Sequence, residues 1–567
     1  MITLIFFLAC VAIVCGYVFY GRKLSQWLGA DPERETPAQH LRDGVDYVPT
    51  PPALLFGHHF SSIAGAGPVV GPIIAALYFG WRPALLWIVI GAIFVGGVHD
   101  YSALMASLRH RGRSIGDICR LYLSPFTYRV FLLFLWFALM YVLIVFLDLT
   151  AGTFAPAEAA ESSVATSSMI YIGVALVFGL CVYKLKLRFW LASAIFVPLV
   201  FVGIYLGVRF PFPTEAMPAW IYSEPKYSWA LILLAYCYFA SILPVWVLLQ
   251  PRDFLSSFLL FACLIGGGAG LIISGFTDAA PIQYPAFITW ADPKLGPLFP
   301  ALFIIIACGA VSGFHSVVSS GTTSKQINNE QSAKPVAYGS MLVEAVLAVI
   351  AVCAVMILPS DYLESGNPEH PTIIFANAIG HFLKTFGLSA RAGGALGLLA
   401  VSTFLLTTLD TCTRLSRFIL EEFFGLDDKN WRYLSTLLTL ILPAVVVFVR
   451  IPDPLVEGAF IPAWKAVWPA FGSSNQLLGA LALLVVFVWL ARQHRARLFV
   501  LLPLIFMMVT TVMALFGLVR KHLFAPQGQA LVGWISVLLL ILACVVVGDA
   551  VRQLRKGDPA VPEEEAV

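Results

Sequence analysis

The chain has 567 residues, of which 59% are hydrophobic and only 12% are charged, and its mean hydropathy is +0.87. Water-soluble domains do not have this composition, and a formal net charge of +3 is too small to indicate a nucleic-acid partner. The sequence therefore predicts an all-α polytopic protein embedded in a lipid bilayer. The ten cysteines are scattered and form no CxxC pair, which predicts small buried side chains rather than a disulfide or metal framework.

Apolar runs of about 17–25 residues, the length that crosses a bilayer, predict about 15 transmembrane helices. The first run lacks the basic region that begins a signal peptide, so we interpret it as a retained span. Residues 372–390 are expected to form a short amphipathic or re-entrant helix. The expected limits of the spans are 2–20, 57–79, 84–107, 130–150, 168–184, 189–209, 229–249, 256–275, 299–320, 336–358, 392–411, 433–450, 472–491, 498–519 and 529–550.

The expected span 57–79 carries residues that interrupt a helix. Pro68 lacks an N–H group, and its ring crowds the preceding turn, while glycines let the backbone leave helical dihedral angles. A helix broken in mid-membrane presents free backbone groups to a cavity, as in the binding sites of secondary transporters. The alternative is a close-packed, kinked helix whose glycines admit neighbouring helices. The substrate contacts predicted here are Ser61, Ser62, Gly65, Ala66 and Gly67.

Two stretches of the chain resemble each other at an offset of 179 residues. Comparison of 60–96 with 239–275 without a gap gives nine identities in thirty-seven positions. The two copies begin at the second and seventh expected spans, and this odd separation gives them opposite orientations in the membrane. We therefore predict an inverted repeat. The expected divisions are 1–56 (first helix and cytoplasmic connector), 57–209 and 229–411 (the two halves), 433–550 (a C-terminal membrane block) and 551–567 (a cytoplasmic tail).

The second half offers two further groups of polar residues. Pro244 falls within the expected span 229–249 and predicts a second interrupted helix, in which Ser241 contacts the substrate. In the expected span 299–320, four polar residues share one helical face by their spacing. Such a stripe in a membrane helix usually faces a cavity, although serines also bond back to the carbonyl four residues earlier. These four predicted substrate contacts are Ser312, His315, Ser316 and Ser319.

Four titratable residues are candidates for proton coupling. His58 and His59 lie near one end of the span 57–79, where they either relay protons or make interfacial hydrogen bonds. Asp100 lies inside the span 84–107, where an ionised carboxyl costs about 2.5–3.5 kcal/mol and needs a partner or a function. The candidate partners are the adjacent His99 and a basic residue such as Arg109 or Arg252, and His99–Asp100 serves either for proton coupling or as a structural ion pair. Arg252–Asp253, in a short cytoplasmic turn, is expected to be a structural salt bridge at a helix end, with a gate as the alternative, and Asp410–Arg414 is expected to be a structural pair.

Lysine and arginine residues concentrate in alternate loops. With fifteen spans, all of the basic loops fall on one side of the membrane, and the positive-inside rule then places the N-terminus outside and the C-terminus in the cytoplasm. The basic loops are 109–113, 184–188, 325–334, 414–432, 492–497 and 552–556.

Three motifs resemble the carbon starvation protein A (CstA) family. They are GHHFSSIAGAGPVVGP at 57–72, LPVW at 243–246 followed by QPRD at 250–253, and SGFHS at 312–316 followed by SGTTSK at 320–325. The resemblance covers roughly residues 45–420. It implies a transporter of the bacterial inner membrane in the amino acid–polyamine–organocation superfamily. That superfamily has a LeuT-like core with a five-plus-five inverted repeat, here with extra N- and C-terminal helices. Family members are associated with uptake of peptides and, in several cases, of pyruvate by proton symport.

We therefore expect a secondary active transporter for a small organic nutrient, and not an enzyme, with no cofactor and no bound metal. Because the interrupted helices carry few acidic residues, a small carboxylate such as pyruvate is favoured over a di- or tripeptide. The expected coupling ion is H⁺, with Na⁺ as the alternative, and the absence of a Walker A loop argues against ATP as the energy source. A membrane-embedded metal-dependent enzyme and a nutrient sensor are the other classes considered. Metal analysis of the purified protein would identify the enzyme, and substrate binding without uptake would identify the sensor.

Overall fold

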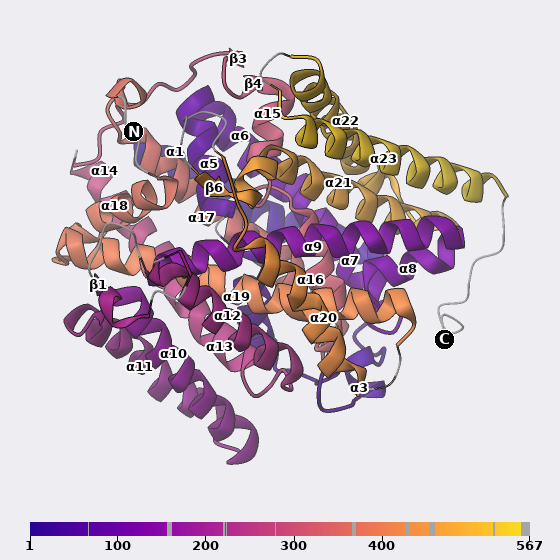
Figure 1. Ribbon diagram of the computed structural model, residues 1–567, viewed down its shortest axis with the longest axis horizontal. Helices are drawn as coiled ribbons and strands as arrows, with labels where there is room; N and C mark the ends of the chain where they lie inside the picture. The colour runs from indigo at the N-terminus through magenta and orange to yellow at the C-terminus, as the bar shows by residue number, and fades with distance from the viewer. Residues whose placement is uncertain are drawn as a thin grey trace.

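The computed structural model describes residues 1–556 except 66, 156–160, 219–220, 223, 278, 366–369, 427, 429, 453–459 and 526–527. Most of the expected tail 551–567 and the candidate Ala66 therefore lie outside the described residues. Helices dominate the structure, and those of the central bundle pack side by side (Figure 1). The all-α membrane architecture that the composition predicts is confirmed.

The helices differ widely in length. In chain order they are α1 (Ile2–Cys15), α2 (Gly21–Leu28), α3 (Pro37–His40), α4 (Pro52–Ile63), α5 (Gly67–Phe79), α6 (Trp81–Gly91), α7 (Gly97–Arg109), α8 (Ile115–Tyr122), α9 (Pro125–Phe154), α10 (Ser163–Gly179), α11 (Phe189–Arg209), α12 (Pro225–Ile242), α13 (Leu249–Phe261), α14 (Gly268–Phe276), α15 (Leu298–Ile305), α16 (Gly313–Gly321), α17 (Ser340–Met356), α18 (Pro371–Leu383), α19 (Ala390–Phe424), α20 (Trp431–Val446), α21 (Ala463–Arg492), α22 (Leu498–Leu523) and α23 (Ala530–Lys556). Short π-helical stretches join α1 to α2, α6 to α7 and α13 to α14 into continuous spans.

Within the described residues, 11 helices are long and apolar enough to cross a membrane, or up to 12 when α4 and α5 count as one bent span. The sequence predicts about 15, and three of its expected spans are not among these helices. The span 229–249 corresponds to the 18-residue α12, the span 433–450 corresponds to the 16-residue α20, and the span 299–320 is divided into α15 and α16. The stretch 372–390, expected as a short helix, contains α18 and a 3₁₀ turn.

Strands are minor elements. Three antiparallel two-stranded ladders join connecting segments: β1 (Glu161–Ser162) with β2 (Phe212–Pro213), β3 (Ala291–Asp292) with β4 (Gly296–Pro297), and β5 (Arg450–Pro452) with β6 (Phe460–Pro462). In their registers, Ser162 faces Phe212, Asp292 faces Gly296, and Ile451 faces Ile461.

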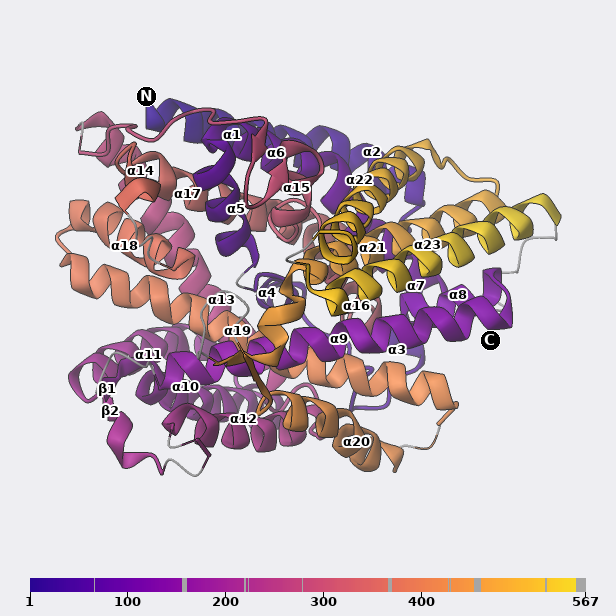
Figure 2. The same cartoon turned by 45° about the horizontal axis from the view of Figure 1, so that its top comes forward.

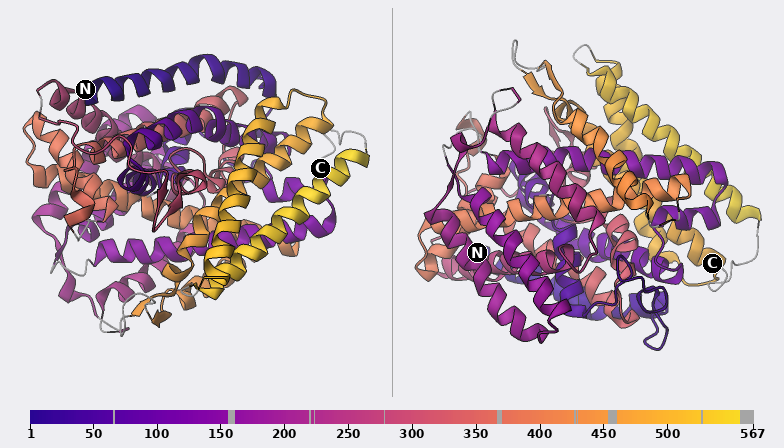
Figure 3. Two further views of the ribbon diagram at one scale, coloured as in Figure 1. Left: turned by 90° about the horizontal axis from the view of Figure 1, so that it is seen from above. Right: turned by 60° about the horizontal axis from the view of Figure 1, so that its bottom comes forward.

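Peripheral helices surround a central group. The continuous helix formed by α1 and α2 runs along the outside of the bundle, and α22 and α23 cover another edge (Figure 3). The hairpin of α10 and α11 lies at the periphery, against α13 (Figure 2). The middle of the protein is formed by α4, α5, α7, α16, α17 and α19, which is where the buried polar residues gather.

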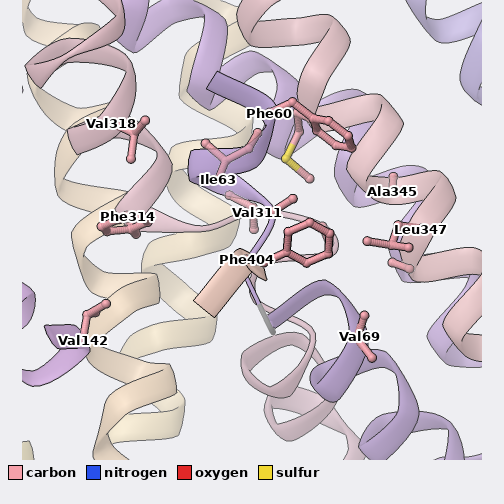
Figure 4. Packing of buried hydrophobic residues seen from close by; sticks show 14 of the residues in the cluster. Phe60, Ile63, Val69, Val142, Val311, Phe314, Val318, Ala345, Leu347 and Phe404 are labelled. Atoms are coloured by element: carbon pink, nitrogen blue, oxygen red, sulfur yellow. The ribbon is translucent and has the colours of Figure 1, made fainter. Parts of the chain in front are cut away.

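Two of the expected spans are interrupted in this central group. In the first, α4 ends at Ile63 and α5 begins at Gly67, and the two helices lie at 45° to each other. This is the interruption that Gly65, Gly67 and Pro68 predict. In the second, α15 ends at Ile305 and α16 begins at Gly313. Figure 4 shows apolar residues near these interruptions, including Ile63, Val69, Val311 and Phe314.

The second interruption does not lie at Pro244, and that prediction is wrong. Helix α12 ends at Ile242, and Pro244 lies in the turn before α13 begins at Leu249. Because α13 belongs to the separate span Leu249–Phe276, the proline ends one helix and does not break a span. Ser312 is also placed differently, because it occupies the N-cap position of α16 instead of a turn within a continuous helix.

Candidate functional site

The two interrupted spans cross where glycines allow the backbones to approach. A Cβ atom on Gly71 would overlap the carbonyl oxygen of Ile305, and one on Gly67 would overlap the side chain of Cys308. A Cβ on Gly96, in the π-helical stretch before α7, would likewise overlap the carbonyl oxygen of Ala310. Glycine is therefore required where α5 and the span of α6 and α7 pass the second interruption.

A carboxylate held between two histidines lies beside this crossing. Oδ1 of Asp100, on α7, lies 2.8 Å from Nδ1 of His99. Its other oxygen, Oδ2, lies 3.0 Å from Nδ1 of His315. All three side chains are fully buried. The candidate pair His99–Asp100 is thus in contact, and His315 of α16 is brought to the same carboxylate. Each histidine nitrogen in such a group can donate or accept a proton.

Glu344 of α17 extends this cluster and is not among the predicted site residues. Its Oε2 lies 3.7 Å from His315 Nε2, and its side chain is fully buried. Neither carboxyl oxygen has a hydrogen-bond partner among the described residues. The sequence does contain a signal for it, because Glu344 is a lone acid within the apolar run 336–358.

A second charged network joins four helices. His58 of α4 contacts Asp253 Oδ2 of α13 at 2.6 Å. Arg252 lies between Asp253, at 2.5 Å, and Asp410 of α19, which also accepts a hydrogen bond from Tyr236 of α12 at 2.8 Å. The expected Asp410–Arg414 pair is wrong, since Asp410 pairs with Arg252. Arg252 and Asp253 lie fully buried within α13 and not in a short exposed turn.

Replacement of Asp410 by asparagine is expected to destabilise the protein by about 3 kcal/mol. The amide keeps the shape of the side chain but leaves Arg252 with one carboxylate in a fully buried site. Thermal unfolding in detergent micelles measures the effect, with Glu215→Gln, on an exposed residue, as the control for loss of one negative charge. An unchanged Tm in Asp410→Asn would show that the network contributes nothing to stability.

The predicted residues of the first interrupted span line its contact with α13 and α19. Ser61 donates to the backbone oxygen of Asp253 at 2.9 Å, and Ser62 donates to that of His58 at 2.8 Å. His59 Nδ1 lies 2.8 Å from the hydroxyl of Thr323. Gly65 lies in the interruption, where its N–H donates to Ile63. All of these candidates lie close to one another in the chain, and the fold buries them together.

The candidates of the second half divide into two places. Ser316 donates to the carbonyl oxygen of Gly313 at 2.7 Å, and the buried hydroxyl of Ser319 has no hydrogen-bond partner among the described residues. Both lie on α16 with His315. Ser241 lies on α12 instead, and its hydroxyl pairs with Thr436 of α20 at 3.2 Å. The structure thus brings α16 to the crossing and leaves Ser241 in contact with α20.

Two amide side chains of α21 satisfy the backbone that the second interruption frees. Asn475 Oδ1 accepts from the N–H of Phe314 at 3.0 Å, and its Nδ2 donates to Ser312 Oγ at 3.1 Å. Gln476 Nε2 donates to the carbonyl oxygen of Val311 at 3.2 Å. Sequence reasoning misses both residues, because α21 belongs to the expected C-terminal block and not to the predicted halves. Their signal is an Asn-Gln pair inside an apolar span.

Replacement of Asn475 by leucine is expected to destabilise the protein by about 2 kcal/mol, the cost of leaving a buried donor without an acceptor. The unpaired group would be the N–H of Phe314 at the start of α16. Thermal unfolding is the measurement, and Asn475→Asp, which retains the acceptor oxygen, is the matched comparison. A leucine variant as stable as the native protein would contradict this role.

The connector before α4 is tied to one end of the bundle. Asp46 lies 2.6 Å from Arg414 and 3.5 Å from Arg417, both of α19. Burial alone would raise the pKa of Asp46, but Arg417, Arg414 and Lys325 hold that pKa below its ordinary value. Arg414 and Arg417 belong to the basic stretch 414–432, one of those that the sequence places on one side of the membrane, although the structure shows both within helix α19.

Within the described part of the chain, no group of three or more His, Cys, Asp or Glu side chains is arranged to hold a metal ion. The central cluster combines buried carboxyl groups, imidazoles and hydroxyls. Such groups exchange protons and accept hydrogen bonds from a small polar ligand.

These features define a class of protein: a multi-pass α-helical membrane protein with interrupted helices and buried titratable residues at its centre. The model of the family described as carbon starvation protein CstA matches residues 1–370 and 364–514. The chain belongs to this family.

Three relatives show how far the similarity extends. The peptide transporter CstA of Bacillus subtilis is 32% identical over 616 residues, covering 100% of this chain and 99% of the relative. The peptide transporter CstA of Escherichia coli is 31% identical over 549 residues, covering 86% of this chain and 77% of the relative. The pyruvate/proton symporter BtsT of Escherichia coli is 30% identical over 582 residues, covering 88% of this chain and 79% of the relative.

Among solved structures, a mutant of the Eremococcus coleocola manganese transporter matches with a TM-score of 0.47 and 15% sequence identity. The match covers 91% of this chain and 99% of that one.

Proposed function

We propose that this protein is a secondary active transporter that takes up a small carboxylate such as pyruvate together with a proton. It acts as a transporter and not as an enzyme. The observation that carries the proposal is the crossing of two interrupted spans beside Asp100, which is held between His99 and His315. Interrupted helices supply a binding site in mid-membrane, and the buried carboxylate with two imidazoles supplies groups that bind and release a proton.

The substrate carboxylate would bind at the first interruption. Helix α5 begins at Gly67, and the first turn of a helix offers N–H groups without intrahelical partners and the positive end of the helix dipole, which suit an anion. Ser61, Ser62 and Gly65 lie immediately before it, and Ala66 belongs to the same proposed site. From the second interrupted span, the proposed contacts are Ser312, His315, Ser316 and Ser319. The relative named as a pyruvate/proton symporter supports this substrate class.

A di- or tripeptide is the second candidate substrate. Several relatives bear the name peptide transporter, and a peptide needs an acidic partner for its α-amino group in addition to a site for its carboxylate. Asp100 and Glu344 are the buried acids near the crossing that could take this role. Competition between pyruvate and a dipeptide therefore separates the two substrate classes.

The inverted repeat remains a proposal, with halves predicted at 57–209 and 229–411. The packing favours a second half that begins at α15. In that case α5 corresponds to α16, α7 to α17, α8 to α18 and α14 to α21. The contact of α5 with α17 then has its equivalent in the contact of α16 with α7, and the contact of α8 with α21 has its equivalent in the contact of α18 with α14. Helices α9 and α19 pack on each other, as do α12 and α20. In this arrangement the two interrupted spans are equivalents, and the hairpin of α10 and α11 is an insertion.

We propose a bacterial inner-membrane location with the C-terminus in the cytoplasm and the N-terminus outside. Several basic loops meet at one end of the bundle: Arg109 pairs with Glu330 at 2.9 Å, and Arg495 donates to the carbonyl oxygen of Leu28 at 3.2 Å. The positive-inside rule assigns that end to the cytoplasm.

Uptake of labelled pyruvate into proteoliposomes tests the proposed function. We expect accumulation that requires an inward proton gradient in sodium-free buffer and that an excess of unlabelled dipeptide does not reduce. Liposomes without protein provide the background. Accumulation of a labelled dipeptide and not of pyruvate would identify a peptide as the substrate. A requirement for sodium would identify Na⁺ as the coupling ion instead of H⁺.

A further inference from the structure

The carboxyl group of Glu344 stands out among the buried charges of the protein. Its side chain is fully buried on α17, and its two oxygens have no hydrogen-bond partner among the described residues. By contrast, Asp100, Asp253 and Asp410 each have close partners. An isolated carboxylate in a membrane interior costs far more than a neutral carboxylic acid, so these surroundings favour a Glu344 that holds a proton.

His315 connects this carboxyl group to the rest of the cluster. Its Nδ1 lies 3.0 Å from Asp100 Oδ2, and its Nε2 lies 3.7 Å from Glu344 Oε2. The titratable groups that act on Glu344 are His315 of α16, Asp100 of α7 and Cys308 of the segment between α15 and α16. One imidazole ring therefore stands between two acids and presents a different nitrogen to each.

We infer that Glu344 carries the transported proton and that His315, held by Asp100, gives this proton to Glu344 and takes it back. This inference rests on the proposed proton symport. In the transfer, the Nε2–H bond of the doubly protonated His315 breaks and an Oε2–H bond forms on Glu344. His315 is left neutral, with its remaining N–H on Nδ1 directed to Asp100. The reverse step returns the proton, and no electron is gained or lost.

The distance between the two groups makes this transfer dependent on a conformational change. A gap of 3.7 Å exceeds the range of about 2.6–3.2 Å over which a proton passes directly. His315 is in the first turn of α16, immediately after the second interruption. Binding of substrate at the interruption, by shifting this turn toward α17, would close the gap and so couple proton transfer to substrate.

The test compares two transport modes in Glu344→Gln. The carboxamide has the shape of the neutral acid but cannot release a proton. We expect gradient-driven accumulation of pyruvate to be lost, while exchange of external labelled pyruvate for internal unlabelled pyruvate is retained and becomes independent of pH. Replacement of a residue with only a structural role would reduce both gradient-driven accumulation and exchange. Ser340→Ala is the matched control, because Ser340 is a buried polar residue one turn earlier on α17 with no carboxyl proton.

Retention of gradient-driven accumulation in Glu344→Gln, with the pH profile of the wild type, would overturn the inference. If wild-type protein itself fails to accumulate pyruvate, the proposed function and this inference fall together. If wild-type protein accumulates pyruvate and Glu344→Gln does the same, only the inference falls. Should Glu344→Gln fail to fold, labelling of wild-type protein by dicyclohexylcarbodiimide, which reacts with protonated carboxyls, decides. Modification of Glu344 that declines at high pH is expected, and an unmodified Glu344 would overturn the inference.

Discussion

Replacement of Asp100 by asparagine is expected to abolish proton-driven uptake, lowering its rate by a factor of about 100 or more, the usual contribution of a positioned proton-transfer group. The carboxylate is the shared partner of His99 and His315. Without its charge, both imidazoles lose the carboxylate that faces their Nδ1 atoms, and the proton-bound state of the cluster loses its stabilisation. Uptake of labelled pyruvate under an inward proton gradient measures the loss.

Asp148→Asn is the matched control for this substitution. Asp148 is also a buried carboxylate within a span, but its partner is Lys226, at 2.7 Å. Its replacement removes the same charge from a pair outside the central cluster. Equal loss of uptake in the two variants, or full uptake in Asp100→Asn, would contradict a coupling role for Asp100.

Replacement of Gly71 by valine is expected to prevent the two interrupted spans from packing and to destabilise the protein by about 3 kcal/mol. A Cβ at this position would overlap the carbonyl oxygen of Ile305, and backbone cannot move aside as a flexible side chain can. The amount of monodisperse protein recovered from detergent, together with its Tm, measures the effect.

Gly173→Val on α10 is the control for the change from glycine to valine in a membrane helix. A Cβ on Gly173 would meet no atom within 4 Å, so we expect normal recovery and an unchanged Tm. If Gly71→Val behaves in the same way, the close crossing of α5 with the second interruption does not exist in the protein.

The sequence is sufficient to predict the class of fold because the bilayer demands long apolar helices. Each expected span has a helical counterpart, and the first interruption is predictable because its helix-breaking residues, Gly65, Gly67 and Pro68, lie within a few positions of one another. The second interruption is not predictable in the same way. Residues 306–312 contain no proline, and their apolar composition is typical of an unbroken helix.

The candidate site is predictable in its residue types and not in its pairings. A histidine beside an aspartate is visible in the sequence at His99 and Asp100, but His58 and Asp253 are 195 positions apart. Helical periodicity relates residues within a few turns and gives no information about such contacts. The same limit explains why Asn475, on a helix outside the predicted halves, is missed although it completes the start of α16.

The measurement that tests proton–substrate coupling most directly is the entry of protons that accompanies the entry of pyruvate. Proteoliposomes would contain a pH-sensitive dye, and the pH would be equal inside and outside. A higher concentration of pyruvate outside would be the only driving force. With wild-type protein we expect the interior to become acidic when pyruvate is added and to stay unchanged with Asp100→Asn. Entry of labelled pyruvate without acidification would contradict proton symport.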